Sequence, residues 1–147
     1  MTQINPNSDV SYPANVARLR KAWIYRTGHA IESSPTIAVG VMYVGSKDQH
    51  VYALEARTEK QFWSHRTEGA IYATPTIVGE VVYIGSENRT VYALTAITGE
   101  KLWSYSADGS IISSSKVTNG LVFVGSNDCN LYAFNQMSIS SEEQEKG

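Results

Sequence analysis

A 40-residue internal repeat constrains this chain more than any other feature of its sequence. Trp23, Trp63 and Trp103 are spaced by 40 residues, and the segments between them align without a gap. Between the first two units almost half of the aligned positions are identical, far more than chance allows. Repeats of this length are typical of solenoids, propellers and helical arrays, in which each unit buries its apolar face against the next.

Each unit contains four short apolar segments, which in the second unit lie at residues 74–78, 81–86, 91–95 and 102–105. These segments are rich in Val, Ile, Tyr and Trp, which favour β-strands, and Gly, Asn, Asp and Glu lie between them. No window shows a helical periodicity of comparable length. Four strands in 40 residues predict a β-propeller blade, so the expected fold class is all-β, with blades of four antiparallel strands.

Two residue types recur at fixed positions of every unit, and we expect them to be structural. The tryptophan of each unit is expected to fill the space between neighbouring blades. A glycine ends the second strand of each blade, where it permits a close approach or a special backbone angle. These docking residues are Trp23, Trp63, Trp103, Gly45, Gly85 and Gly125.

The end of each unit resembles the tryptophan-docking repeat of the pyrroloquinoline-quinone (PQQ) propeller family, which runs roughly Ala-x-Asp-x-x-Thr-Gly-x-x-x-Trp. Thr98, Gly99 and Trp103 follow this pattern in the second unit. The first copy departs from it with Glu59 in place of the glycine, and the last docking motif is absent after the third unit. The resemblance covers residues 22–135 and implies a PQQ-like β-propeller.

The repeats supply three blades' worth of strands. An outer strand around Trp23 precedes two full sets of four strands and a final set of three inner strands, which makes twelve. Three blades cannot close a ring, so the chain is either an open fragment of a longer propeller or half of a six-bladed dimer. In the dimer, the Trp23 strand of one chain would complete the last blade of the other.

The expected divisions are an N-terminal extension (1–20), the repeats (21–136, in units 23–62, 63–102 and 103–136) and a polar acidic tail (137–147).

Charge and composition exclude several classes of function. The 12 Lys and Arg residues against 14 Asp and Glu give a net charge of −2, which excludes a basic nucleic-acid footprint. The one cysteine, Cys129, leaves too few thiolates for a structural zinc site. No apolar run reaches the roughly 20 residues of a membrane span. The compartment stays open: cytoplasmic if Met1 is the native start, periplasmic or extracellular if the chain is a fragment of an exported protein.

The residues assemble no recognisable catalytic motif. The family resemblance implies that a dehydrogenase would need calcium held by Glu, Asn and Asp, an Asp base and often a pair of adjacent cysteines. Here Cys129 is alone, and Asp48 and Asp128 occupy equivalent turn positions, where bonding to the turn backbone is a sufficient role. We therefore expect no catalytic residues, no metal and no cofactor. PQQ with calcium is required only under the alternative that the chain is a fragment or degenerate relative of a quinoprotein dehydrogenase.

Binding is the function that remains. The longest connections join each Trp strand to the next innermost strand, at residues 27–34, 67–74 and 107–114, and their chemistry differs most between copies. Loops on a rigid frame often carry function. We expect a non-catalytic interaction or scaffold module, similar to non-catalytic family members such as the propeller lipoprotein of outer-membrane assembly, that binds a protein partner or a second copy. A small-ligand or carbohydrate-binding propeller is the remaining alternative. The expected contact residues are His29, Glu32, Glu68, Tyr72, Asp108 and Ile112.

Overall fold

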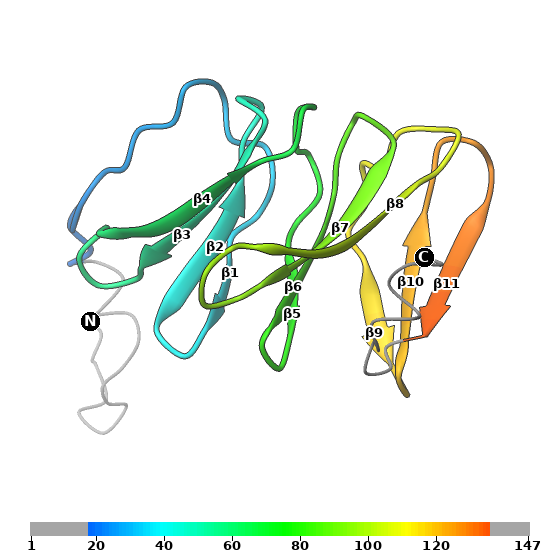
Figure 1. Cartoon of the computed structure of the whole chain (residues 1–147). Coiled ribbons are helices and arrows are strands. Elements are labelled where there is room, and N and C mark those ends of the chain that lie inside the picture. The colour runs from blue at the N-terminus through cyan, green and yellow to red at the C-terminus, as the bar shows by residue number, and fades with distance from the viewer. Residues whose placement is uncertain (1–17, 136–147) are drawn as a thin grey trace, which may run out of the picture.

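The computed structural model describes residues 18–135, which form eleven strands in three antiparallel sheets. The sheets stand side by side in an open row, and within each sheet consecutive strands pair as hairpins (Figure 1). This arrangement confirms the all-β class built from propeller blades. Residues 18–135 include no helix that is long and apolar enough to cross a membrane.

The blades follow one another along the chain. The first consists of β1 (Thr36–Ala38), β2 (Val41–Gly45), β3 (His50–Glu55) and β4 (Gln61–Arg66). The second consists of β5 (Thr76–Val78), β6 (Val81–Gly85), β7 (Thr90–Thr95) and β8 (Lys101–Ser106). The third has only β9 (Lys116–Thr118), β10 (Leu121–Gly125) and β11 (Leu131–Asn135).

The strands expected in the second unit are confirmed to within two residues at each end. The largest difference is at β5, which begins at Thr76 and not at residue 74. Pro75 lacks an N–H group and cannot donate to a sheet ladder. The N–H of Thr74 donates instead to the Ser114 hydroxyl of the next blade, at 3.0 Å. Neighbouring blades are therefore tied together where their inner strands begin.

The expected twelfth strand, around Trp23, is not formed. Residues 21–26 have no sheet partner within the described part of the chain, since no third strand of a preceding blade lies beside them. Trp23 docks on the first blade all the same, because its indole N–H donates to the carbonyl oxygen of Ala56 at 3.2 Å. Trp63 makes the equivalent bond to Ala96 at 2.9 Å.

Two apolar clusters fill the junctions between the blades. In the first junction Trp63 is 8% exposed and packs with Tyr43 of its own blade and Leu94 of the next. In the second, Trp103 lies against Phe134, with ring centroids 5.4 Å apart. The tryptophans therefore fill the space between blades, as the repeat predicts.

Two glycines allow one chain segment to approach another closely. A Cβ atom at Gly45 would lie 2.2 Å from Cγ2 of Ile71, and one at Gly85 would lie 2.1 Å from Cγ2 of Ile111. Neither glycine has a positive φ, so of the two expected reasons the close approach applies. At Gly125 the nearest atom in the described part of the chain is the Ser113 hydroxyl oxygen, at 3.5 Å. The third copy of this contact is not made within residues 18–135.

Some expectations fall outside the described residues. The tail, residues 137–147, and most of the N-terminal extension, residues 1–20, belong to the terminal segments that the structure leaves undescribed. The boundaries proposed for the three repeat units remain predictions.

Replacing Trp63 by Ala tests the junction. We expect the substitution to lower the free energy of unfolding by about 3–5 kcal/mol, because a buried aromatic ring and its hydrogen bond to the next blade are both lost. Phe62, its neighbour on β4, is 47% exposed, and Phe62→Ala is the matched control, with an expected change of about 0.5 kcal/mol. Urea denaturation measures both. Equal losses in the two variants would contradict this account of the junction.

Candidate interaction surfaces

The predicted contact loops form a hydrogen-bonded rim at one end of the blades. The connection after β4 is bonded on both sides. The Thr67 N–H donates to the Gln49 carbonyl oxygen of the first blade at 2.8 Å, and the Glu87 N–H of the second blade donates to Ala70 at 2.9 Å. The connection after β8 repeats the first of these bonds, from Ala107 to Arg89. The loops are therefore part of the rigid frame.

A carboxylate holds the turn of the first blade in this rim. Asp48 Oδ2 accepts hydrogen bonds from the Tyr52 hydroxyl at 2.5 Å and from the Gly28 N–H at 2.8 Å. Its other oxygen, Oδ1, accepts the N–H of His50 at 3.0 Å. Asp48 therefore has the structural turn role expected from its repeat position.

The other two blades use the same arrangement. The Tyr132 hydroxyl donates to Asp128 Oδ2 at 2.5 Å. In the second blade an amide replaces the carboxylate, and Asn88 Nδ2 donates to the Tyr92 hydroxyl at 3.0 Å. A charged and a neutral side chain thus serve the same structural purpose at equivalent positions.

The hydrogen bonds favour the ionised carboxylates. Partial burial raises the pKa of Asp48, but the bonds from Tyr52, Gly28 and His50 outweigh burial and leave this pKa below its ordinary value of 3.8. The bond from Tyr132 is the main cause of the lowered pKa of Asp128. Burial, and then the bond to Asp48, raise the pKa of Tyr52, so its hydroxyl stays a proton donor.

Two of the six predicted contact residues converge, on a lysine that the sequence analysis did not single out. Lys47 Nζ lies 3.3 Å from Glu32 Oε2 and 5.6 Å from the centre of the Tyr72 ring. The hydrogen bond that Lys47 donates to Glu32 is the main cause of the raised pKa of Lys47, which keeps the amine cationic. Because the carboxylate and the ring already partner the amine, this cluster offers little free charge to a ligand.

The other four predicted residues do not join that cluster. The Nδ1 atom of exposed His29 accepts the N–H of Ala30 at 2.7 Å. Glu68 is exposed, with a left-handed φ of 74°. Asp108 bonds to Asp128 through its backbone N–H alone, and Ile112 is 45% exposed. The six residues remain a prediction as a contact surface.

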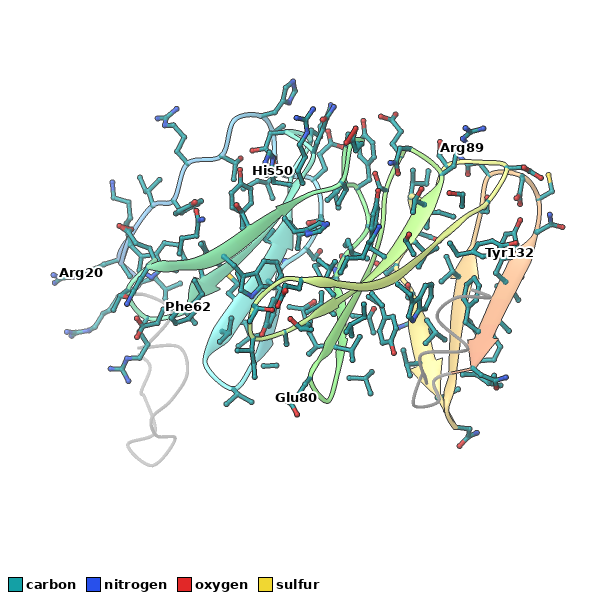
Figure 2. All side chains as sticks on the ribbon, in the orientation of Figure 1. Arg20, His50, Phe62, Glu80, Arg89 and Tyr132 are labelled. Carbon is teal, nitrogen blue, oxygen red and sulfur yellow. The ribbon has the colours of Figure 1, made fainter. Side chains whose placement is uncertain are left out.

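An apolar groove that the sequence analysis missed lies at the opposite end of the blades. Its volume is about 380 Å³, within the usual range for binding sites. It opens between the β1–β2 and β5–β6 hairpins, and Figure 2 shows Glu80 of the second hairpin at the other end of the molecule from His50 and Arg89. The residues that line it are Ala38, Val39, Val41, Tyr43, Phe62, Ile77, Gly79, Glu80, Ala96 and Ile97.

Val39, at the rim of this groove, has a conformation that a β-branched residue rarely adopts. Its φ is 50°, in the left-handed region, and its side chain is 100% exposed, so no packing offsets the strain. The equivalent hairpin positions carry Gly79 and Asn119, which tolerate this backbone. Strain of this kind is found at functional sites. The alignment of the repeats could have indicated this strained position, because only the first copy has a β-branched residue there.

The acidic side chains that the structure describes are not arranged as a calcium–quinone site. Within residues 18–135, no three His, Cys, Asp or Glu side chains gather as possible metal ligands. Asp48, Asn88 and Asp128 lie one to a blade, and each bonds within its own turn or to the adjoining connection. Cys129 is exposed in the turn between β10 and β11, with a φ of 75°. No chemical step through that cofactor follows from these residues.

Comparison with known families places the fold. A family model described as outer membrane protein assembly factor BamB matches residues 47–138, which is more than half of the chain. The chain belongs to this PQQ-like propeller family. A second model, for the β-propeller domain of glucose/ethanol/alcohol dehydrogenase, matches residues 2–72. The resemblance seen in the repeats is confirmed.

Solved structures of this PQQ-like family share the fold at low sequence identity. BamB from Moraxella catarrhalis superposes with a TM-score of 0.69 at 23% identity, over 79% of this chain and 37% of that one. A quinohemoprotein alcohol dehydrogenase from Pseudomonas putida gives 0.65 at 19% identity, over 83% and 24%. The chain thus spans well under half the length of either. No curated protein matches it in sequence.

Asp48→Asn tests the structural role of the carboxylates through the pH dependence of stability. A carboxylate whose pKa is lowered by folding stabilises the protein above its unfolded pKa, and this contribution is lost as pH falls through the folded value. We expect the wild type to lose stability below about pH 4. Asp48→Asn should be less stable at neutral pH, because the amide has only one acceptor oxygen in place of the two that Asp48 uses, but it should lose less stability on acidification. Urea titrations at several pH values measure this.

Asp108→Asn is the matched control, because no group within residues 18–135 donates a hydrogen bond to the Asp108 side chain. It should keep the acid dependence of the wild type. The same flattening in both variants would contradict the assignment to Asp48.

Proposed function

We propose that this chain is a non-catalytic protein-interaction module, and that it binds apolar side chains of a partner protein in the groove between the β1–β2 and β5–β6 hairpins. The main observation behind this proposal is the conformation and exposure of Val39. A strained and fully exposed valine at the rim of an apolar groove contributes nothing to the packing of its own blade. Contact with a partner is the role that its position favours.

The groove offers the chemistry that an apolar side chain needs. Tyr43 is 3% exposed, whereas Ile97 and Phe62 are 70% and 47% exposed at the rim. Covering such a surface stabilises a complex by roughly 25 cal/mol per Å² of apolar area. Glu80 is the one charged residue among the described residues that line the groove, so a basic residue beside the apolar one would suit the partner.

The next junction does not repeat this surface. The position of Val39 is taken by Gly79 there, that of Glu80 by Gly120 and that of Phe62 by Leu102. A partner that recognises these side chains would therefore bind the first junction and not the second. This difference supports recognition of a particular partner over general adhesion to blades.

The family supports a scaffold role without deciding it. One matching family description names an outer membrane assembly factor, which favours an exported protein over a cytoplasmic one. The six residues of the opposite rim, with Glu32 and Tyr72 at its centre, are a second candidate contact surface. A carbohydrate ligand remains the less supported alternative, because the groove presents few polar groups.

Photo-crosslinking in the source organism tests the groove. A benzophenone amino acid at Ile97 should give a discrete adduct with a partner protein, and the same group at Thr118, exposed at the end of β9 in the third blade, should not. Adding Val39→Asn should weaken the adduct several-fold while raising stability by about 1 kcal/mol, because Asn tolerates the left-handed backbone. Equal adducts at both sites, or an adduct insensitive to Val39→Asn, would contradict the proposal.

Adding PQQ together with calcium tests the dehydrogenase alternative. We expect no change in melting temperature or in tyrosine and tryptophan fluorescence, because the carboxylates of the turns are engaged within the blades. Calcium alone is the control. A saturable rise in melting temperature that needs both components would overturn the non-catalytic assignment.

A further inference from the structure

The two ends of the row of blades carry matching vacancies. Leu131 of β11 is 73% exposed, whereas the equivalent Val51 and Val91 are 0% and 1% exposed because the next blade covers them. At the other end, residues 21–26 have the place in the repeat of a fourth strand, and within the described part of the chain they lack a sheet partner. Among the residues that the structure describes, one end lacks the strand that the other end leaves unpaired.

The packing contact at each strand end is also split between the two ends. In the first two blades an isoleucine that follows the fourth strand sits against the glycine that ends the second strand, Ile71 against Gly45 and Ile111 against Gly85. In the third blade, Gly125 has no such neighbour among the described residues. The matching isoleucine is Ile31, which is 46% exposed, whereas Ile71 and Ile111 are fully buried.

The hydrogen bonds between inner strands continue the same pattern. The Ser34 N–H donates to the Thr74 hydroxyl at 3.1 Å, and the Thr74 N–H donates to the Ser114 hydroxyl at 3.0 Å. The next bond in the series would run from the Ser114 N–H to the hydroxyl of Ser34. Within a single open row these two groups lie in the first and the last blade.

We propose that a second copy of this chain fills both vacancies, with residues 21–26 of each copy adding to β11 of the other and Ile31 of each seated on Gly125 of the other. The register follows from the first blade, where His50 pairs with Arg66 and Val51 with His65. The third-strand residue of each pair is moved two repeats along the chain and the fourth-strand residue one repeat back. The pairs then become Asn130 with Arg26 and Leu131 with Tyr25. The added strand is antiparallel, and it restores a four-stranded third blade.

Ring geometry favours two copies of the row of blades that residues 18–135 form. Three blades from each of two chains make six, which lies within the known range of four to eight blades, whereas three chains would make nine. A two-fold axis relates the two new junctions, so each copy contributes the same two surfaces and no edge is left open. A single chain cannot make this contact with itself, because residues 18–35 and β11 lie at opposite ends of the row (Figure 1).

Light scattering after gel filtration is the first test. The wild type is expected at twice 16.2 kDa. Ile31→Lys and Gly125→Val should each reduce the mass to that of one chain. Both should keep the circular dichroism of the wild type, because Ile31 is exposed in the single chain and a Cβ at Gly125 meets no atom of the described residues closer than 3.5 Å. Ile112→Lys is the matched control, since Ile112 is 45% exposed and lies outside the proposed contact.

A cysteine pair tests the register itself. The equivalents of Asn130 and Arg26 in the second blade are Thr90 and Ser106, whose hydroxyl oxygens lie 3.5 Å apart, so cysteines at such a pair can reach each other. In a Cys129→Ser background, Asn130→Cys with Arg26→Cys should give a disulfide-linked dimer on a non-reducing gel. Asn130→Cys with Tyr25→Cys should give far less, because a shift of one residue turns the side chain to the other face of the sheet.

A wild type that runs as a single chain would overturn the proposal. A dimer that survives both Ile31→Lys and Gly125→Val, or one that crosslinks equally through both cysteine pairs, would overturn it as well. The proposed partner groove lies between the first two blades and away from both vacant ends, so crosslinking at Ile97 should be unaffected by Ile31→Lys. The two proposals can therefore fail separately.

Discussion

The structure depends on the docking of each blade onto the next. A four-stranded blade has two faces with apolar side chains, and it cannot bury either one alone. The indole of Trp63 fills this junction, and its N–H donates to the Ala96 carbonyl oxygen of the following blade. The close approach at Gly45 then brings the next connection down onto the strand end. The Trp63 indole, its hydrogen bond to Ala96 and the small size of Gly45 together set the distance between the blades.

Because of this docking, the loops of the rim are part of the scaffold, and the groove at the other end of the blades is the candidate binding surface. The rim loops resemble free loops in the sequence, but backbone hydrogen bonds and the Asp48 and Asp128 carboxylates fix them between neighbouring turns. The groove at the other end arises where two hairpins of adjacent blades diverge. The frame is rigid enough to hold Val39 in a backbone conformation that its side chain disfavours.

The same rule explains why apolar side chains are exposed at the two ends of the described row of blades. Every junction needs a docking face on each side, and no residue between 18 and 135 forms a further blade against the outer face of the third one. Leu131 is exposed there although its repeat equivalents are buried. An unpaired strand edge beside an exposed apolar side chain favours association. The proposed assembly would therefore follow from the repeat architecture as much as from any particular residue.

The regular repetition of one unit along the chain made much of the structure predictable. Because each blade repeats the same contacts, the spacing of Trp23, Trp63 and Trp103 predicted the blades, and the strand bounds were right to within two residues. The error at residues 21–26 has a physical cause, since a strand exists only when another strand pairs with it and the sequence does not say which neighbours are present. The convergence of Glu32 and Tyr72 on Lys47 was likewise invisible in the separate repeats.

The sequence by itself determined the blade, its strand order, the docking tryptophans and the glycines at the strand ends, because these are local or strictly periodic features. Only the tertiary structure decided which surfaces are free. The groove combines Phe62 and Val41 of one blade with Ile77 and Ile97 of another, and the exposure of Ile31 depends on the blade that would cover it. Burial is a property of neighbours in space, and a repeat sequence specifies the contacts that a blade can make without specifying which of them are made.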